Sequence, residues 1–234
     1  MRGHGMTNTL NHVPGDKATG TIAHGKEDEN LQLSIDQLCE DFAFILTRFM
    51  QWFNRHSGGS KRKVHFYLVG HSLGGAVLTK VLYEQDKQIK KRLSDEIFQN
   101  VKGLVIIDIV EETAVKALGS MNSYLRSVPP QFASLQSAID WHVKTGLIHN
   151  RKSAEISIPV MFTPSKKRAG FYEWVLDLSK TERYWKDWFT GLSYNFVNIT
   201  SRVSKMLILS NNDYLDKDLM IGQMQDDSNW SFYS

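Results

Sequence analysis

The stretch FYLVGHSLGGAVL (residues 66–78) runs from a β-branched and aromatic segment through a Gly-His-Ser-Leu-Gly turn into small and aliphatic residues. Residues 64–70 predict a buried strand, and residues 73–85 predict an amphipathic helix after it. The turn fits G-x-S-x-G, in which glycines two positions either side of Ser72 avoid collisions with neighbouring backbone. Such a turn lifts the Ser72 hydroxyl clear of a sheet and directs the N–H of Leu73 at the oxygen of an incoming carbonyl.

Further apolar runs predict the rest of the sheet. VKGLVIIDIV (101–110) is continuous in the way that buried parallel strands are, and KMLILS (205–210) predicts a last strand. A helical spacing of apolar residues covers 31–53, and helical segments separate the strands. This alternation predicts a parallel sheet with crossover helices, an α/β fold. We expect a single domain over 1–234 with a helical cap insertion at about 112–200.

Three local patterns refine these elements. Ser34 is a polar residue suited to the start of the first helix. Residues 171–178, FYEWVLDL, alternate apolar and polar and predict a half-buried strand. Ser179 and Glu182 have the spacing of a capping box for the helix TERYWKDWF.

The composition narrows the class of protein. The chain has 234 residues, 41% of them hydrophobic and 23% charged, with a net charge of +3, which is ordinary for a soluble globular protein. Short basic clusters such as Lys90-Lys91-Arg92 are interpreted as solvated ends of elements rather than as a nucleic-acid surface. Cys39 is the single cysteine, which excludes an intrachain disulfide. Without a signal-peptide or membrane-length apolar run, we expect a soluble intracellular protein with no membrane partner.

A serine hydroxyl becomes a good nucleophile only when a base takes its proton, and in this fold an acid and a histidine follow the serine. Asp108 ends GLVIID at the carboxyl edge of a predicted parallel strand, where such sites lie. The same residue also suits an N-cap, with Glu111 closing a capping box. Asp213 also leaves a strand end, with an Asx turn as its alternative. The alternative for Ser72 is a capping serine in a glycine-rich turn.

The histidine is the missing member of this set. After Ser72 the chain contains only His142 and His149, in IDWHVKTGLIHN. Both fall inside the predicted helical insertion, and we interpret each as a partly exposed polar residue rather than a base. The residues alone therefore supply a nucleophile and an acid without a histidine after the final predicted strand.

Longer blocks of the sequence resemble the protein phosphatase methylesterase family of α/β-hydrolases. These blocks are LVGHSLGGAV, GLVIIDIVEETAVKAL, FASLQSAIDWHVKTGLI, YEWVLDLSKTERYWKDWFTGLS and LDKDLMIGQMQ, which together span roughly residues 64–225. The family's His-Gly-Gly oxyanion loop and its triad histidine have no counterpart in the sequence. We therefore expect a chain truncated at both ends.

The resemblance implies a function and the residues that carry it. Ser72 would be the nucleophile, Asp108 rather than Asp213 the triad acid, and Gln223 and Met224 part of the surface near a bound phosphatase. The implied reaction is hydrolysis of the methyl ester on the C-terminal leucine of the type 2A protein phosphatase catalytic subunit, in the cytoplasm or nucleus. It needs no metal and no organic cofactor.

Two other functions stay open. The chain as given is an inactive phosphatase-binding module if no histidine completes the triad. A general carboxylesterase or lipase with a lid is the other alternative, and the family-specific blocks disfavour it.

Overall fold

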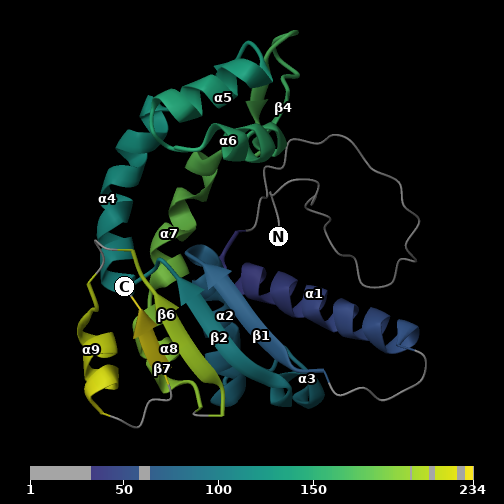
Figure 1. The fold of residues 1–234 in the computed structure, drawn as a ribbon, viewed down its shortest axis with the longest axis vertical. Coiled ribbons are helices and arrows are strands. Elements are labelled where there is room, and N and C mark those ends of the chain that lie inside the picture. Colours follow the sequence, from purple (N-terminus) through teal and green to yellow (C-terminus); the bar gives the residue numbers. More distant parts are fainter. Residues whose placement is uncertain (1–32, 58–63, 201, 211–213, 226–229, 234) are drawn as a thin grey trace. The chain divides into compact units, whose positions relative to one another are not determined.

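Four parallel strands form the main sheet of the computed structural model (Figure 1). The structure describes residues 33–57, 64–200, 202–210, 214–225 and 230–233. Along the sheet the order is β1-β2-β6-β7, and every neighbouring pair is parallel. The strands are β1 (Phe66–His71), β2 (Val101–Ile107), β6 (Ser204–Ile208) and β7 (Trp230–Tyr233). The predicted parallel α/β sheet is confirmed, and β7 is a strand that the sequence pattern did not reveal.

The described residues fall into two compact units. The sheet unit comprises residues 34–124 and 181–234, and the second unit comprises residues 125–180 together with Leu33. Among the described residues, no helix is both long enough and apolar enough to cross a lipid bilayer.

Helices of the sheet unit connect and cover its strands. They are α1 (Ile35–His56), α2 (Leu73–Asp86), α3 (Asp95–Gln99), the first part of α4 (Glu111–Ser127), α7 (Glu182–Phe189), α8 (Leu192–Asn198) and α9 (Lys217–Met224). Helix α2 contacts β1, β2, α1 and α8. Nine of its 14 residues are buried, so the prediction of an amphipathic helix there is wrong. The cause is that α2 packs against other helices as well as against the sheet.

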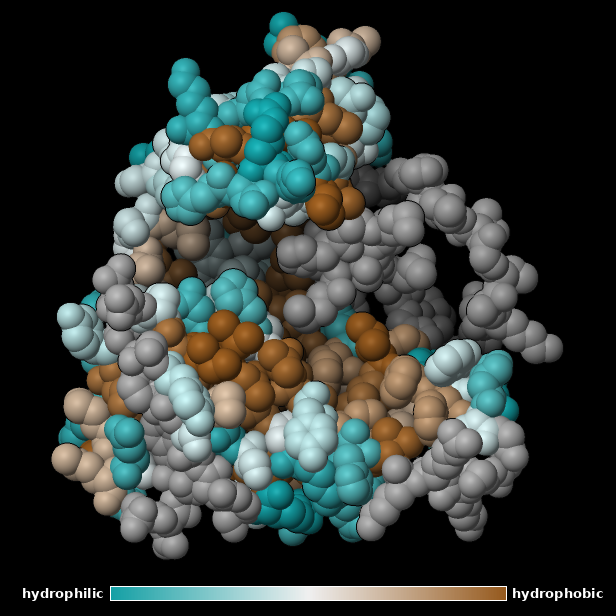
Figure 2. Space-filling model, in the orientation of Figure 1, coloured by the Kyte–Doolittle hydropathy of each residue, from teal (hydrophilic) through white to brown (hydrophobic). Residues whose placement is uncertain are grey.

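The two faces of the sheet differ in their cover. Leu104, Ile106 and Leu207 are buried on the face that α2 covers, where the Ile106 side chain lies against Gly75. On the opposite face Tyr67 and Val69 of β1 are 70% and 61% exposed. Figure 2 shows apolar residues gathered over this side of the strands. Parallel sheets usually carry helices on both faces. It is therefore unusual that no element among the described residues covers Tyr67 and Val69 on this face.

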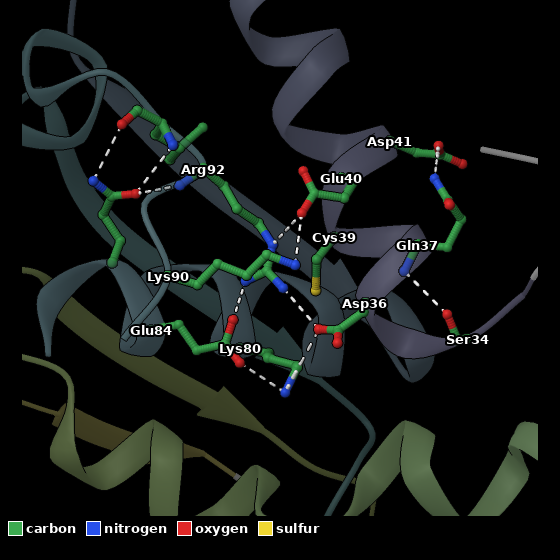
Figure 3. Close-up of polar contacts among 12 residues, drawn as sticks. Ser34, Asp36, Gln37, Cys39, Glu40, Asp41, Lys80, Glu84, Lys90 and Arg92 are labelled. Atoms are coloured by element: carbon green, nitrogen blue, oxygen red, sulfur yellow. Dashed lines mark hydrogen bonds and ion pairs between the residues drawn. The ribbon is translucent and has the colours of Figure 1, made fainter. Parts of the chain in front are cut away.

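A buried arginine ties α1 to α2 (Figure 3). The side chain of Arg92 is 1% exposed and pairs with Asp36 of α1 at 2.7 Å, with Glu40 of α1 at 3.2 Å and with Glu84 of α2. Burial acts against the charge, but the ion pair with Glu84 and its neighbours outweighs burial and raises the pKa of Arg92. The expectation that this basic cluster is solvated is therefore wrong for Arg92. Burial also raises the pKa of the Cys39 thiol to about 12.

The 125–180 unit has its own small core. Its strands β3 (Gln131–Phe132), β4 (Phe162–Pro164) and β5 (Tyr172–Trp174) form an antiparallel sheet in the order β3-β5-β4, with helices α5 (Leu135–Lys144) and α6 (Arg151–Ser157). Buried Phe132, Ile139, Ile158 and Phe162 pack together in its centre. The half-buried strand predicted over 171–178 is present as the shorter β5.

Local capping was predicted at two helices with opposite results. Ser34 is the N-cap of α1, and its side chain accepts a hydrogen bond from the N–H of Gln37 at 3.2 Å, as expected. The capping box predicted for α7 is wrong, because Thr181 rather than Ser179 precedes this helix. The hydroxyl of Ser179 instead donates to Asp177 at 2.6 Å.

Candidate active site

Ser72 lies between β1 and α2 in a strained conformation. Its φ is 49° and its ψ is −122°, a region that residues other than glycine rarely adopt. Its N–H donates to the carbonyl oxygen of Ile107 on the neighbouring strand at 2.9 Å, and its side chain makes no capping hydrogen bond to α2. The alternative of a capping serine is therefore wrong.

The glycines around Ser72 have different roles. A Cβ at Gly70 would lie 2.6 Å from Gly74 C and from Gly75 N, so the predicted crowding is confirmed on this side. A Cβ at Gly74 would meet no atom of the described residues within 4 Å, so the same prediction is wrong there. Gly75 is the second crowded position, because its Cβ would lie 3.2 Å from the Ile106 side chain. Glycine is therefore required at Gly70, before the turn, and at Gly75, which is one residue after the second glycine of the G-x-S-x-G pattern.

Leu73 begins α2, and its N–H is available for a ligand. The N–H groups of Gly75 and Ala76 donate to the carbonyl oxygen of Ser72 at 2.8 and 3.3 Å. Within the described part of the chain, no residue accepts a hydrogen bond from the N–H of Leu73. Because the first N–H groups of a helix lack intrahelical partners, this group can donate to an oxyanion beside Ser72.

Asp108 follows β2 in a second strained turn. Its φ is 55°, its N–H donates to the carbonyl oxygen of Ile208 at 2.7 Å, and its side chain is 44% exposed. Helix α4 begins at Glu111, so Asp108 lies too early to be its N-cap. The predicted capping box is also wrong, because the Glu111 carboxylate instead accepts hydrogen bonds from the N–H groups of Gly191 and Ser193.

The sheet register brings Ser72 and Asp108 to the same edge of the sheet. His71 at the end of β1 is paired with Ile107 at the end of β2, and each candidate residue follows directly. The imidazole Nε2 of His71 lies 4.0 Å from Asp108 Oδ2. Sequence reasoning treated His71 only as a variable position of the motif. The signal for it was its place one residue before Ser72 on a strand that runs beside β2.

The other histidines considered lie in the 125–180 unit. His142 was expected to be partly exposed, but it is 4% exposed, and its Nδ1 lies 2.7 Å from the carbonyl oxygen of Ala138. Aromatic rings surround it, namely those of Phe132, Trp141, Phe162 and Trp174. His142 is thus a core residue of its unit, whereas His149 is exposed. Asp213, the rival acid, lies outside the described residues.

Gln223 and Met224 form the last turn of α9 and are both exposed, Met224 by 85%. The preceding Gly222 is buried, and a Cβ there would lie 2.6 Å from a methyl group of Val197 in α8. This close approach fixes α9 against α8. No contact recorded for the described residues joins Gln223 or Met224 to Ser72.

No family model matches the chain, but several curated proteins that share one name are similar to it in sequence. Protein phosphatase methylesterase 1 of Candida albicans is 39% identical over 225 residues, which are 93% of this chain and 54% of that protein. The proteins of the same name from Saccharomyces cerevisiae and Schizosaccharomyces pombe are 38% and 36% identical, over 86% and 94% of this chain and 46% and 58% of their own lengths. The chain spans about half the length of the curated relatives it matches.

Solved structures agree on the fold. The crystal structure of E-2-(acetamidomethylene)succinate hydrolase superposes with a TM-score of 0.61 at 13% identity, covering 99% of this chain and 69% of the other. The thioesterase domain from the curacin biosynthetic pathway superposes with a TM-score of 0.52 at 18% identity, over 86% of this chain and 66% of that domain. The chain is thus similar in sequence, over about half of their length, to protein phosphatase methylesterases, and it has the fold of the α/β-hydrolases.

Proposed function

We propose that this protein is a serine carboxylesterase of the methylesterase type, with Ser72 as nucleophile and Asp108 as acid. The observation that carries the proposal is the pair of strained residues at the ends of adjacent parallel strands, next to the available N–H of Leu73. Strained backbone persists only where surrounding structure holds it, and it concentrates at functional sites. Similarity in sequence to the methylesterases supports the same assignment.

In this mechanism the Ser72 hydroxyl oxygen attacks the ester carbonyl carbon while a histidine takes its proton. Asp108 orients that histidine and stabilises its charged form, and the N–H of Leu73 donates to the oxyanion. The tetrahedral intermediate then expels methanol, which takes the proton back, and water releases the acid from Ser72. Among the described residues, no histidine hydrogen-bonds to Ser72.

The proposed substrate is the methyl ester on the C-terminal leucine of the type 2A protein phosphatase catalytic subunit. The names of the relatives support a methylated phosphatase as partner. Exposed Gln223 and Met224 are the proposed contact surface on α9, and the helical cap insertion expected at about 112–200 remains part of the proposal. The expected place of action is the cytoplasm or the nucleus, and no cofactor is proposed.

The test is methanol release from the methylated phosphatase catalytic subunit, measured for the full chain and for Ser72→Ala. We expect turnover where a histidine completes the triad, and none above background for Ser72→Ala. Asp108→Asn is expected to lower kcat by about 10⁴-fold, because the histidine then loses its orienting charge. Equal turnover by the chain and by Ser72→Ala would rule out the proposed nucleophile.

Two other outcomes assign the alternatives. Binding to the phosphatase without methanol release, and without labelling of Ser72 by a fluorophosphonate, would make the chain a binding module. Rapid cleavage of small aryl esters with no turnover of the phosphatase ester would make it a general carboxylesterase.

A further inference from the structure

Glu111 makes a long-range contact from the start of α4. One carboxylate oxygen accepts a hydrogen bond from the N–H of Gly191 at 2.8 Å, and the other accepts one from the N–H of Ser193 at 3.2 Å. Gly191 is the N-cap of α8 and has a φ of 80°. Glu111 therefore binds the first turn of a helix that lies about 80 residues further along the chain.

The same turn of α8 is joined to α9. The hydroxyl of Ser193 donates to Asp216 Oδ2 at 2.5 Å, and Asp216 Oδ1 accepts from the N–H of Leu219 at 3.1 Å. Ser193 and Asp216 are 2% and 8% exposed. Hydrogen bonds between charged and neutral groups that are shielded from water are stronger than exposed ones. We call Glu111, Gly191, Ser193 and Asp216 the Glu111 junction, and it connects α4, α8 and α9.

Asp108 needs such an anchor because its backbone is strained. On its N-terminal side the N–H is held by the carbonyl oxygen of Ile208. On its C-terminal side Ile109 and Val110 are 7% and 0% exposed, and Glu111 follows at once. A non-glycine residue at positive φ is strained and persists only when its surroundings hold it in that conformation. With two buried residues between them, Glu111 is close enough in the chain to fix the position of Asp108.

We propose that Glu111 is a positioning residue that holds the Asp108 turn in place through the Glu111 junction. This inference rests on the proposed role of Asp108 as the acid of the ester hydrolysis. The junction also relates the acid to α9, which carries Gln223 and Met224, because Asp216 is the N-cap of that helix. Glu111 thus connects the reacting edge of the sheet to the proposed partner surface.

The test compares Glu111→Gln with Glu112→Gln in the full chain. Glu112 is a matched control, because it is also acidic in the first turn of α4 but is 55% exposed and, among the described residues, forms an ion pair with Lys116 alone. In Glu111→Gln one oxygen acceptor becomes an amide donor that faces an N–H group, so the junction is broken. Two readouts are measured, hydrogen exchange of individual backbone amides and the kinetics of ester hydrolysis.

For Glu111→Gln we expect exchange of the Asp108, Gly191 and Ser193 amides to be about tenfold faster or more. We expect kcat to fall about tenfold with KM within about twofold, because misplacing the acid affects the transition state more than binding. Glu112→Gln should change neither readout. If Glu111→Gln does not fold, Glu111→Asp keeps the charge on a side chain one methylene shorter and should show the same pattern more weakly.

Faster exchange at Gly191 and Ser193 with unchanged exchange at Asp108 would overturn the proposal, since Glu111 would then only cap α8. Unchanged kcat in a variant with faster Asp108 exchange would overturn it as well. If the unmodified chain shows no hydrolysis above Ser72→Ala, the proposed function fails, and the exchange of the Asp108 amide alone then decides whether Glu111 positions that residue.

Discussion

The turn at Ser72 and the turn at Asp108 solve the same problem by different means. Both follow a parallel strand, both place a non-glycine residue at positive φ, and both connect to a helix. The Ser72 turn is specified by its near neighbours, since Gly70 and Gly75 leave room where a Cβ would collide. The Asp108 turn has no glycine beside it and depends on Ile208 and on the Glu111 junction, both distant in the sequence.

The comparison shows what maintains each strained backbone conformation. Around Ser72 the backbone segments approach closely because Gly70 and Gly75 have no Cβ. Around Asp108 the chain carries full side chains, and hydrogen bonds from β6 and α8 restrain it. Substitutions close in sequence should therefore damage the first turn, whereas substitutions far away should damage the second.

The largest effect is expected for Gly70→Ala. Its new Cβ would lie 2.6 Å from backbone atoms, which cannot move aside as a flexible side chain would. We expect the free energy of unfolding to fall by about 3 kcal/mol, measured by urea denaturation. Gly74→Ala is the control, because its Cβ meets open space among the described residues, and alanine there should stabilise α2 by up to about 1 kcal/mol. Equal losses for the two variants would show that the turn is not fixed by local crowding.

An intermediate effect is expected when the strain itself is removed. Ser72→Gly and Asp108→Gly allow positive φ without a Cβ, and each should raise the free energy of unfolding by about 1 kcal/mol while abolishing hydrolysis. The gain is smaller than the strain because glycine also makes the unfolded chain more flexible. Denaturation of each variant measures it. A loss of stability in either variant would mean that the residue is not strained in solution.

An effect of similar size, which appears only when the pH changes, concerns the far end of α8. Lys205 of β6 is 4% exposed, and its Nζ donates to the carbonyl oxygens of Val197 and Ile199 at 2.8 and 3.0 Å. Burial lowers the pKa of Lys205 to about 8, whereas an unfolded lysine titrates near 10.4. Between these values the unfolded chain binds more protons, so stability rises with pH and is lost as pH falls through the folded pKa.

The expected gain between pH 7.5 and 9 is about 1 kcal/mol, measured as the difference in the free energy of unfolding. Lys205→Met should remove this gain and keep the packing of the stem. Buried Cys39, with its raised pKa, acts in the opposite direction from about pH 8 upward, where an unfolded thiol loses its proton, so the contribution of Lys205 is the difference between the chain and Lys205→Met at each pH. An unchanged pH dependence in Lys205→Met would show that the amine is already neutral or is solvated.

Several errors of the sequence analysis have one physical origin. Arg92 was expected to be solvated, yet carboxylates from α1 and α2 surround it. His142 was expected to be partly exposed, yet Phe132, Phe162 and Trp174 from three separate segments enclose it. A local capping box with Asp108 was one of two interpretations of Glu111, yet Glu111 accepts from the first turn of α8. In each case the partners come from distant segments, and a pattern of neighbouring residues contains no information about them.

By itself the sequence determined β1, β2 and β6 of the parallel sheet, the helix after Ser72 and the glycine-dependent turn, because each depends on residues that are close together in the chain. The blocks that resemble one family determined the fold class as well. Only the tertiary structure decided that Asp108 lies beside Ser72, that Gly75 rather than Gly74 is the crowded glycine, and that Glu111 reaches α8. Those features depend on strand order and on contacts between segments up to about 80 residues apart, which packing creates and local propensity does not.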